Sequence, residues 1–442
     1  MRASEVAHIV KGRLIGQDVA FKGFCIDSRE VKGGEVFVAI KGQRHDGHSF
    51  IHEAFQRGAS GALSQRLMEV PKGKFLVLVK DTLEALRGIA LFKRDKFKGR
   101  VIGVVGSAGK TTTKELIYFL LSSMGKICRT PKNYNSQIGV PLSLANFDED
   151  CLFWVVEMGA GKRGDIKNLT RIVKPNVGVI TAIGEEHLET FGCLDDVISG
   201  NGEIFHDFDN KGWAVIPDYV SHCYDVKSKV TFGKSGDVKA ESLRIWEYGM
   251  EFSVDGTKVF MKAPSLGLLE NALCSIGVLK ALGYDWREFL ERFENFKPVS
   301  GRFRVIKEEN LTILDDTYNA NPPSVKKALE TLSLFDGYKV ALLGDMLELG
   351  HASEKYHRDI GKLCAELNID ECIFHGKDML YAFEECNIRK KECYFFRTKE
   401  EIIEHLMRVR KQKSFVLVKG SRGMRMEDIV ESLLTIYKKI VI

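Results

Sequence analysis

Continuous apolar runs recur along the chain, separated by segments with helical spacing. They cover residues 101–105, 152–158 and 177–183 in the middle of the chain, and 311–316, 339–345, 371–376 and 414–420 in its last third. Such runs, without polar alternation, are typical of parallel strands buried on both faces. Alternating with amphipathic helices, they predict an α/β fold with doubly wound parallel sheets.

Two regions depart from this pattern. Between 241 and 262, apolar and polar residues alternate around Asp255-Gly256, which predicts an antiparallel hairpin at the side of the main sheet. Helical spacing returns at 268–282. The first 97 residues hold shorter elements, for which we expect strands at 35–42 and 74–79 and a helix at 51–64.

Two segments are candidate domain boundaries. Residues 92–100 form a charged run, which we interpret as a solvated connection, and 298–301 read Pro-Val-Ser-Gly. A chain of 442 residues is expected to hold about three domains at ~150 residues each. We therefore expect a small mixed α/β domain at 1–98, a central parallel-sheet ATPase domain with an antiparallel side sheet at 99–299, and a Rossmann-like domain at 300–442.

Composition excludes several classes of function. Apolar residues make up 44% of the chain and 65 basic side chains face 60 acidic ones, so we expect an ordinary globular protein without the broad cationic surface that binds nucleic acid. No run approaches the ~18 apolar residues of a membrane span, and no signal peptide is apparent. Ten scattered cysteines lack any C-x-x-C pair, so we expect reduced thiols, no cysteine metal site and a cytoplasmic location.

The first candidate site is the glycine-punctuated turn in VIGVVGSAGKTTTKE, at 101–115. Gly106, Ser107, Ala108 and Gly109 sit where a buried strand passes into a helix, and Lys110, Thr111 and Thr112 open that helix. Backbone N–H groups in such a loop cradle phosphates, the lysine reaches the outer phosphates, and the Thr111 hydroxyl can ligate Mg²⁺. Val104 replaces the usual first glycine. An ordinary strand–helix turn is the alternative, but the lysine followed by three threonines favours nucleoside triphosphate binding.

Polar residues at the ends of other apolar runs add further candidates, because α/β sheets bind ligands there. Glu157 ends the run at 152–158 and either ligates the same Mg²⁺ or merely caps a helix. His187 follows the run at 177–183 and is either a ligand or structural. The segment at 315–323 either forms a simple turn or supplies ribose and base contacts. Lys419 and Ser421 end the last run.

Taken in this order, the motifs resemble those of the ATP-dependent Mur ligases of peptidoglycan synthesis. The resemblance covers nearly the whole chain and rests on DSR and KGQRHDGHSF near the N-terminus, on GSAGKTTTKE, KNYNSQIGVPLSL, VEMGA, GEEHLETFG and NGEIF in the middle, and on DDTYNANPPSV, LLGDMLELG and KGSRGM in the last third. The last three are particular to the member that joins D-alanyl-D-alanine to UDP-N-acetylmuramoyl-tripeptide. The DNPR signature of the members that add the third amino acid is absent.

This resemblance implies a two-step amide synthesis with ATP and Mg²⁺. ATP phosphorylates the terminal carboxylate of the UDP-linked tripeptide, and the dipeptide amine then displaces phosphate. It also implies roles for individual residues. These are Lys110 on the β- and γ-phosphates, Thr111 and Glu157 on a first Mg²⁺, His187 on a second metal, Asn135 near the acyl centre, Asn271 and Arg302 on adenine and phosphate, Asp316 on ribose, Ser28, Arg29 and Arg44 on the UDP group, and Tyr318, Asn319, Asn321, Lys419 and Ser421 on substrates.

One position departs from the family pattern. Many relatives have a carbamoylated lysine where this chain has Asn201, and an asparagine cannot form a carbamate. Glu203 or a water network is a possible substitute. Alternative functions are another amino-acid-adding Mur ligase, a folylpolyglutamate synthase, or a nucleotide-driven switch without ligation. We also expect a monomer.

Overall fold

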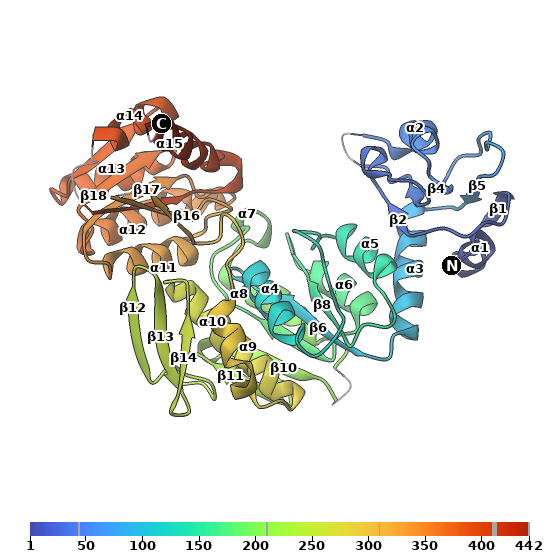
Figure 1. Ribbon diagram of the computed structural model, residues 1–442, viewed down its shortest axis with the longest axis horizontal. Helices are drawn as coiled ribbons and strands as arrows, with labels where there is room; N and C mark the ends of the chain where they lie inside the picture. The colour runs from blue at the N-terminus through green and yellow to red at the C-terminus, as the bar shows by residue number, and fades with distance from the viewer. Residues whose placement is uncertain (43–44, 209–210, 309, 409–412, 441–442) are drawn as a thin grey trace.

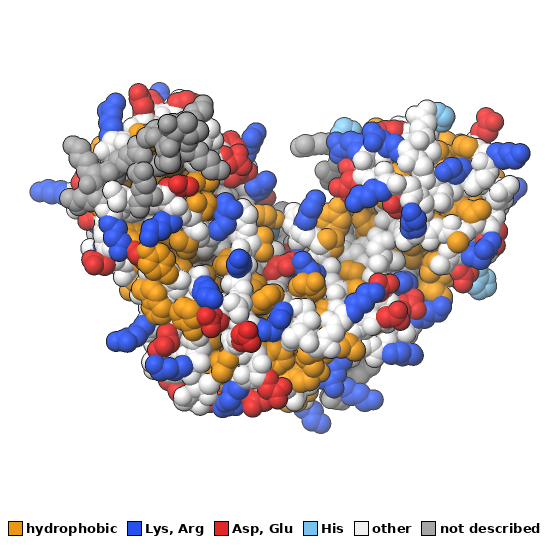
Figure 2. Space-filling model, in the orientation of Figure 1, with side chains coloured by type: hydrophobic (Ala, Val, Ile, Leu, Met, Phe, Trp, Pro, Cys, Tyr) orange, Lys and Arg blue, Asp and Glu red, His pale blue; other side chains and the backbone are white. Residues whose placement is uncertain are grey.

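The computed structural model describes residues 1–42, 45–208, 211–308, 310–408 and 413–440, and the chain forms three α/β domains. The N-terminal and C-terminal domains rise from opposite ends of the central domain (Figure 1). In the space-filling view an open notch separates them, and basic and acidic side chains are interspersed over the visible face (Figure 2). Within the described residues no helix is long and apolar enough to cross a membrane.

The N-terminal domain is built on a five-stranded sheet of order β1-β5-β4-β3-β2, in which only the pair β1–β5 is antiparallel among the described strands. Its elements are α1 (Ala3–Ile9), β1 (Arg13–Gly16), β2 (Phe24–Cys25), β3 (Val36–Val38), α2 (Ile51–Gln56), β4 (Gly61–Ser64), β5 (Phe75–Leu78) and α3 (Thr82–Lys96). The helix expected at 51–64 is wrong in its second half, because the chain turns at Gly58 (φ 99°) and enters the buried strand β4.

The central domain carries a six-stranded parallel sheet of order β11-β10-β9-β6-β8-β7 and the expected antiparallel side sheet β12-β13-β14. Its elements are β6 (Arg100–Val105), α4 (Lys110–Leu121), β7 (Ile127–Arg129), α5 (Gly139–Asn146), β8 (Phe153–Glu157), α6 (Asp165–Val173), β9 (Val177–Ile180), α7 (Leu188–Phe191), α8 (Leu194–Gly202), β10 (Trp213–Pro217), β11 (Lys229–Phe232), β12 (Ser242–Trp246), β13 (Gly249–Val254), β14 (Thr257–Met261), α9 (Leu266–Leu282) and α10 (Leu290–Asn295).

Two predictions for the central domain are confirmed. The hairpin β13–β14 turns at Asp255 and Gly256, both with positive φ (48° and 70°), as a two-residue turn that matches strand twist requires. Helix α9 spans the predicted helical region and is buried almost all round, between the parallel sheet and the side sheet. Ser265 caps its first turn, and Gly283 (φ 84°) ends it.

The C-terminal domain has a six-stranded sheet of order β15-β16-β20-β17-β18-β19, in which β15 is antiparallel to β16 and the other described pairs are parallel. Helices cover both faces, with separate apolar cores. The elements are β15 (Arg304–Glu308), β16 (Leu311–Asp316), α11 (Pro322–Ser333), β17 (Tyr338–Gly344), α12 (Ser353–Glu366), β18 (Glu371–His375), α13 (Met379–Ile388), β19 (Cys393–Phe396), α14 (Lys399–Arg408), β20 (Ser414–Lys419) and α15 (Glu427–Ile440).

The connection expected at 92–100 is more than a solvated linker. Helix α3 continues through Lys96, and the buried Phe97 stacks on Trp154 with ring centroids 4.0 Å apart. Leu86 of the same helix packs in the N-terminal core, while Ala90 packs in the central core. Helix α3 therefore anchors one domain on the other. We retain 98/99 and 299/300 as proposed borders.

The prediction that all ten cysteines are reduced is wrong for one pair. Cys128 of β7 and Cys151, just before β8, form a disulfide with Cα atoms 6.1 Å apart. The pairing arises because β7 and β8 are neighbours in the sheet. The eight other cysteines are free.

Asn146, at the end of α5, completes the edge of the N-terminal sheet. Its Oδ1 accepts the N–H of Phe24 (2.8 Å) and its Nδ2 donates to the carbonyl of the same residue (3.0 Å), so the side chain pairs with β2 as a neighbouring strand would. These are bonds between two domains. They pair the backbone of Phe24, which is 7% exposed, with an exposed side chain.

We predict that Asn146→Ala destabilises the junction of the N-terminal and central domains. Because Asn146 is exposed, water can take its place at Phe24, and the expected cost is the net worth of ordinary hydrogen bonds, about 0.5–1.5 kcal/mol each. The expected result is a lower thermal midpoint and faster proteolysis near β2. Asp150→Ala, at an exposed position four residues further along the chain, is the control. Melting of Asn146→Ala at the wild-type temperature would contradict this role.

Candidate active site

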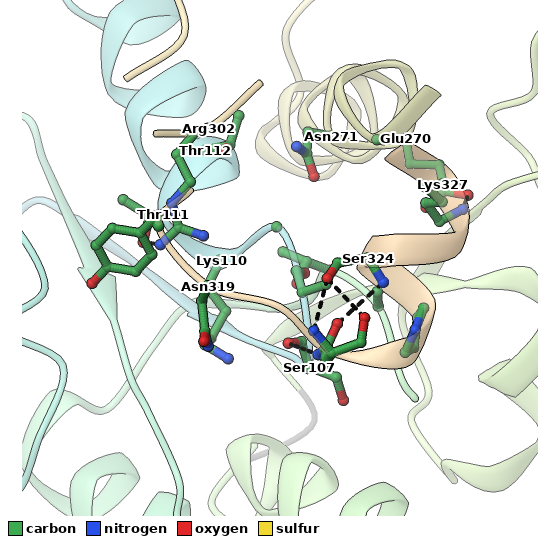
Figure 3. A pocket seen from close by; sticks show the side chains of 18 of the residues that line it. Ser107, Lys110, Thr111, Thr112, Glu270, Asn271, Arg302, Asn319, Ser324 and Lys327 are labelled. Atoms are coloured by element: carbon green, nitrogen blue, oxygen red, sulfur yellow. Dashed lines mark hydrogen bonds and ion pairs between the residues drawn. The ribbon is translucent and has the colours of Figure 1, made fainter. Parts of the chain in front are cut away.

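The candidate nucleotide site is a cavity of about 300 Å³ between the central and C-terminal domains. Side chains from α4 and α9 on one side face side chains from the β16–α11 region on the other (Figure 3). Most residues singled out from the sequence line it. They are Ser107, Ala108, Gly109, Lys110, Thr111, Thr112, Asn135, Glu157, His187, Asn271, Arg302, Asp316, Tyr318, Asn319, Asn321 and Lys419.

The phosphate loop has the predicted strand–turn–helix form. It leaves β6 at Gly106 (φ 136°) and enters α4 after Gly109 (φ 82°), two backbone conformations that favour glycine. The Ser107 hydroxyl donates to the carbonyl of Gly184 (2.9 Å) and accepts its N–H (3.1 Å), which ties the loop to the segment after β9. Lys110 Nζ lies 3.3 Å from Glu186 Oε2, so an anionic group already faces this lysine.

Thr111 and Glu157 come together as predicted. The Thr111 hydroxyl donates to Glu157 Oε1 (3.2 Å), and Asn135 Nδ2 donates to the same oxygen (2.8 Å). A hydroxyl and a carboxylate at the phosphate end are the hard oxygen ligands that Mg²⁺ prefers. Within the described residues no three His, Cys, Asp or Glu side chains form a self-contained metal site. The residues therefore fit an Mg²⁺ whose remaining ligands are phosphate oxygens and water, the usual arrangement for this ion.

His187 lines the same cavity, but its ring is engaged by the other domain. Its Nδ1 pairs with Glu348 Oε2 of the C-terminal domain, and both residues have positive φ (45° and 65°). Its role as a metal ligand remains a prediction.

The polar side chains around the expected carbamate position make hydrogen bonds to backbone groups of the central domain. Asn201 is 2% exposed, and its Nδ2 donates to the carbonyl of Val197 one turn earlier in α8. Both carboxylate oxygens of Glu203 accept backbone N–H groups around the start of α6, from Gly164 and Lys167. In this structure Glu203 is thus a helix cap.

The C-terminal domain delivers a cation to the phosphate end. Arg302 Nη2 donates to the Thr111 hydroxyl (3.1 Å), and the guanidinium lies 3.7 Å from the ring centre of Tyr318. Burial lowers the pKa of Arg302 from its ordinary value. Because that ordinary value is so high, the arginine is still charged at neutral pH. Asn321 Nδ2 donates to the carbonyl of Ser107 (3.0 Å), so the second domain also contacts the phosphate loop itself.

Several predicted contacts are used inside the protein. Asp316 accepts from Lys419 Nζ (2.6 Å) and from the N–H of Phe303 (3.1 Å). Asn271 Oδ1 accepts from the Thr113 hydroxyl (3.1 Å), under the phosphate loop. Ser421 is 4% exposed and links two loops of the C-terminal domain through Leu347 and Ala320. Their ligand contacts stay predictions.

The predicted UDP-binding residues do not line this cavity. The buried Ser28 hydroxyl donates to Glu53 (2.9 Å), and Arg29 pairs with Asp27, whose pKa this hydrogen bond lowers. Arg29 lines a second cavity of about 720 Å³ between the N-terminal and central domains, together with Arg129 and Tyr134. Arg44 lies outside the described residues.

Sequence reasoning missed several residues of the nucleotide cavity, among them the polar side chains of Glu186, Tyr219, Glu270 and Lys327. Glu270 of α9 and Lys327 of α11 form an ion pair between the two domains (Figure 3). Tyr219 follows β10, so its position at a strand end was a usable signal. The residue is 54% exposed, but its hydroxyl bonds to the backbone of Ile183, and desolvation of that hydroxyl raises the pKa of Tyr219.

Comparison with known proteins agrees with this architecture. The chain matches the family models "Mur ligase family, catalytic domain" over residues 20–94, "Mur ligase middle domain" over 104–279 and "Mur ligase, glutamate ligase domain" over 301–422. It is 31% identical to the UDP-N-acetylmuramoyl-tripeptide–D-alanyl-D-alanine ligase of Bacillus subtilis, with 97% of each chain covered. The chain belongs to the Mur ligase family.

Solved structures show which member of the family this chain resembles. It matches MurF from Acinetobacter baumannii with a TM-score of 0.89 at 28% identity, with 98% of each chain covered. It matches MurF from Thermotoga maritima in complex with ADP with a TM-score of 0.84 at 32% identity, over 96% of this chain and 99% of that one. The protein is thus a MurF-type Mur ligase, an ATP-dependent peptide ligase.

We predict that Lys110→Ala lowers the ligation rate about 10²- to 10³-fold, because removing one preorganised contact to developing charge has effects of this size. Nζ contacts only Gly106 and Glu186 among the described residues, so the thermal midpoint is expected to stay near that of the wild type. Lys234→Ala, a change of an exposed lysine in the same domain, is the control. Near-wild-type turnover of Lys110→Ala would overturn the phosphate-loop assignment.

Proposed function

We propose that this Mur ligase joins D-alanyl-D-alanine to UDP-N-acetylmuramoyl-tripeptide in peptidoglycan synthesis. The observation that carries the proposal is the full-length similarity, near 30% identity, to several proteins named for that reaction. The C-terminal segment DDTYNANPPSV supports it, because Tyr318, Asn319 and Asn321 line the nucleotide cavity.

In the proposed first step a carboxylate oxygen of the tripeptide attacks the γ-phosphorus of ATP. The bond between that phosphorus and the β–γ bridging oxygen breaks, ADP leaves, and an acyl phosphate forms. The protein must position the reactants and neutralise charge. Lys110 and Arg302 supply positive charge at the phosphate end, and Thr111 with Glu157 would hold Mg²⁺, which would shield the phosphate oxygens.

In the second step the dipeptide amine attacks the acyl carbon. The carbon–oxygen bond to phosphate breaks, inorganic phosphate leaves and the amine loses a proton. Asn135 lies beside Glu157 on the wall of the cavity, which suits contact with the acyl group. The second cavity, with Arg29 and Arg129 in its lining, suits an anionic nucleotide group, and we propose that it receives part of the UDP moiety.

A cytoplasmic location, a monomeric state and the absence of nucleic-acid partners stay predictions. The alternatives are another amino-acid-adding Mur ligase, a folylpolyglutamate synthase and a nucleotide-driven switch. Each differs from the proposed reaction in which molecules are required for ATP turnover. The deciding experiment therefore varies the acceptor and the amine.

We predict that ADP release requires both UDP-N-acetylmuramoyl-tripeptide and D-alanyl-D-alanine. The reason is that phosphoryl transfer to the tripeptide carboxylate leads to repeated turnover only when the dipeptide amine then forms the amide and releases phosphate. A panel assay would pair tripeptides differing in their third residue with the dipeptide, and the corresponding UDP-dipeptide with single amino acids. Folate with glutamate and nucleotide alone serve as controls. ADP release with the UDP-dipeptide and a single amino acid, or with nucleotide alone, contradicts the proposal.

We further predict that activity does not depend on bicarbonate. Asn201 cannot be carbamoylated, and its amide is buried and bonded within α8. Wild-type rates in CO₂-depleted buffer are expected to be equal with and without added bicarbonate. A clear rescue would mean that a lysine elsewhere forms the carbamate and that Asn201 is wrongly matched to the family position.

A further inference from the structure

Lys114 is a lysine without solvent contact, and it lies beside Glu157, a residue that lines the nucleotide cavity. It lies on α4, four residues after Lys110, and its side chain is 0% exposed. Lysine is almost never fully buried unless it is paired. Charged partners are therefore expected around its ammonium group.

The ammonium group is held by a loop and by carboxylates. Nζ donates to the carbonyls of Thr130 and Lys132 (both 2.9 Å) and lies 3.2 Å from Glu115 Oε1. It also lies 3.5 Å from Glu157 Oε2. An ammonium has three donor hydrogens, and these partners are enough to use all of them.

Glu157 is the same carboxylate that faces Thr111. Its Oε1 is directed to Thr111 and Asn135, whereas Oε2 is buried and accepts no hydrogen bond from any residue that the structure describes. The positive charge beside Oε2 is therefore that of Lys114. Oε1 therefore faces the cavity, and Oε2 faces the lysine.

The loop held by Lys114 is the loop that delivers Asn135. Thr130 accepts the N–H of Glu157 through its hydroxyl (3.0 Å), and the Asn135 carbonyl accepts the N–H of Gly159 (2.8 Å). The segment from 130 to 135 is therefore fastened to the end of β8 at both of its ends, and Lys114 lies between these attachments. One side chain joins α4, this loop and Glu157.

Stability alone is a poor explanation for such a group. Replacing a buried ion pair by apolar residues of similar size is often neutral or stabilising. Groups behind a metal ligand, in contrast, orient that ligand, and their removal typically weakens metal affinity or activity about 10- to 100-fold. The contacts of Lys114 match the second description.

We propose that Lys114 is a positioning residue of the ligation reaction, which holds Glu157 in its metal-binding orientation and fixes the loop that carries Asn135. This inference rests on the proposed function, because that function places Mg²⁺ at Glu157. Lys114 itself is not among the described residues that line the nucleotide cavity.

The test uses Lys114→Met, which retains much of the side-chain length and removes the charge. Lys114→Gln retains a donor for the loop carbonyls and replaces the first variant if that one does not fold. Lys339→Met is the matched control. Lys339 is another buried lysine, 5% exposed near the start of β17, and donates to the carbonyl of Phe335 (3.2 Å); it does not line the cavity.

ADP binding is measured by calorimetry at a series of Mg²⁺ concentrations and in EDTA, with thermal denaturation alongside. We expect Lys114→Met to bind ADP in EDTA as the wild type does, and to need about 10- to 100-fold more Mg²⁺ for the metal-dependent gain in affinity. Lys339→Met is expected to lower the thermal midpoint without moving the Mg²⁺ dependence.

A wild-type Mg²⁺ dependence in folded Lys114→Met or Lys114→Gln, with only a lower thermal midpoint, overturns the proposal and makes Lys114 a structural residue. Failure of the proposed function is recognised separately. Absence of Mg²⁺-dependent ADP binding by the wild type would remove the metal site at Glu157 and overturn this inference, whereas failure of the proposed ligation would be read from the assay that varies the acceptor and the amine.

Discussion

The burial of the Glu157 carboxylate is the constraint on which the centre of this molecule depends. A carboxylate that is 2% exposed has lost most of its hydration, at a cost of several kcal/mol unless charges and hydrogen bonds replace the water. Here the replacements come from separate segments: α4 supplies Thr111 and Lys114, and the loop before α5 supplies Asn135. Satisfying one charge therefore places the phosphate helix, the strand end and the substrate-side loop relative to one another.

The second constraint is that the site belongs to two domains. Parallel sheets collect polar side chains at the carboxyl ends of their strands, and here the sheet of the central domain and that of the C-terminal domain present those ends to one cavity. The contacts across it are polar: Arg302 to Thr111, Asn321 to Ser107 and Glu270 to Lys327. Polar interfaces between domains are typical of parts that move relative to each other, so this surface suits the proposed reaction, which would have to admit three substrates.

The sequence predicted most of the strands that are buried on both faces, although it missed β10, an interior strand of the central sheet. Strands β6, β8, β9 and β16 appear as unbroken apolar runs, and the phosphate loop is recognisable because its glycines and lysine are adjacent in the chain. Strands at or near sheet edges, such as β2, β7 and β19, are short and carry no such signal, and they were missed. The helix expected at 51–64 failed because helical spacing over a few residues does not exclude a following strand.

Sequence by itself determined the fold class, the family and most of the residues at the nucleotide cavity, because these depend on local spacing. Only the tertiary structure decided which polar groups remain available to a ligand. Ser28 and Ser421 are bonded within the protein, Glu203 caps a helix, and Cys128 meets Cys151 across two neighbouring strands. Lys114, a surface-type residue in the sequence, became buried beside Glu157. The physical reason is that desolvation and pairing are properties of neighbours in space, which residue type and spacing along the chain do not specify.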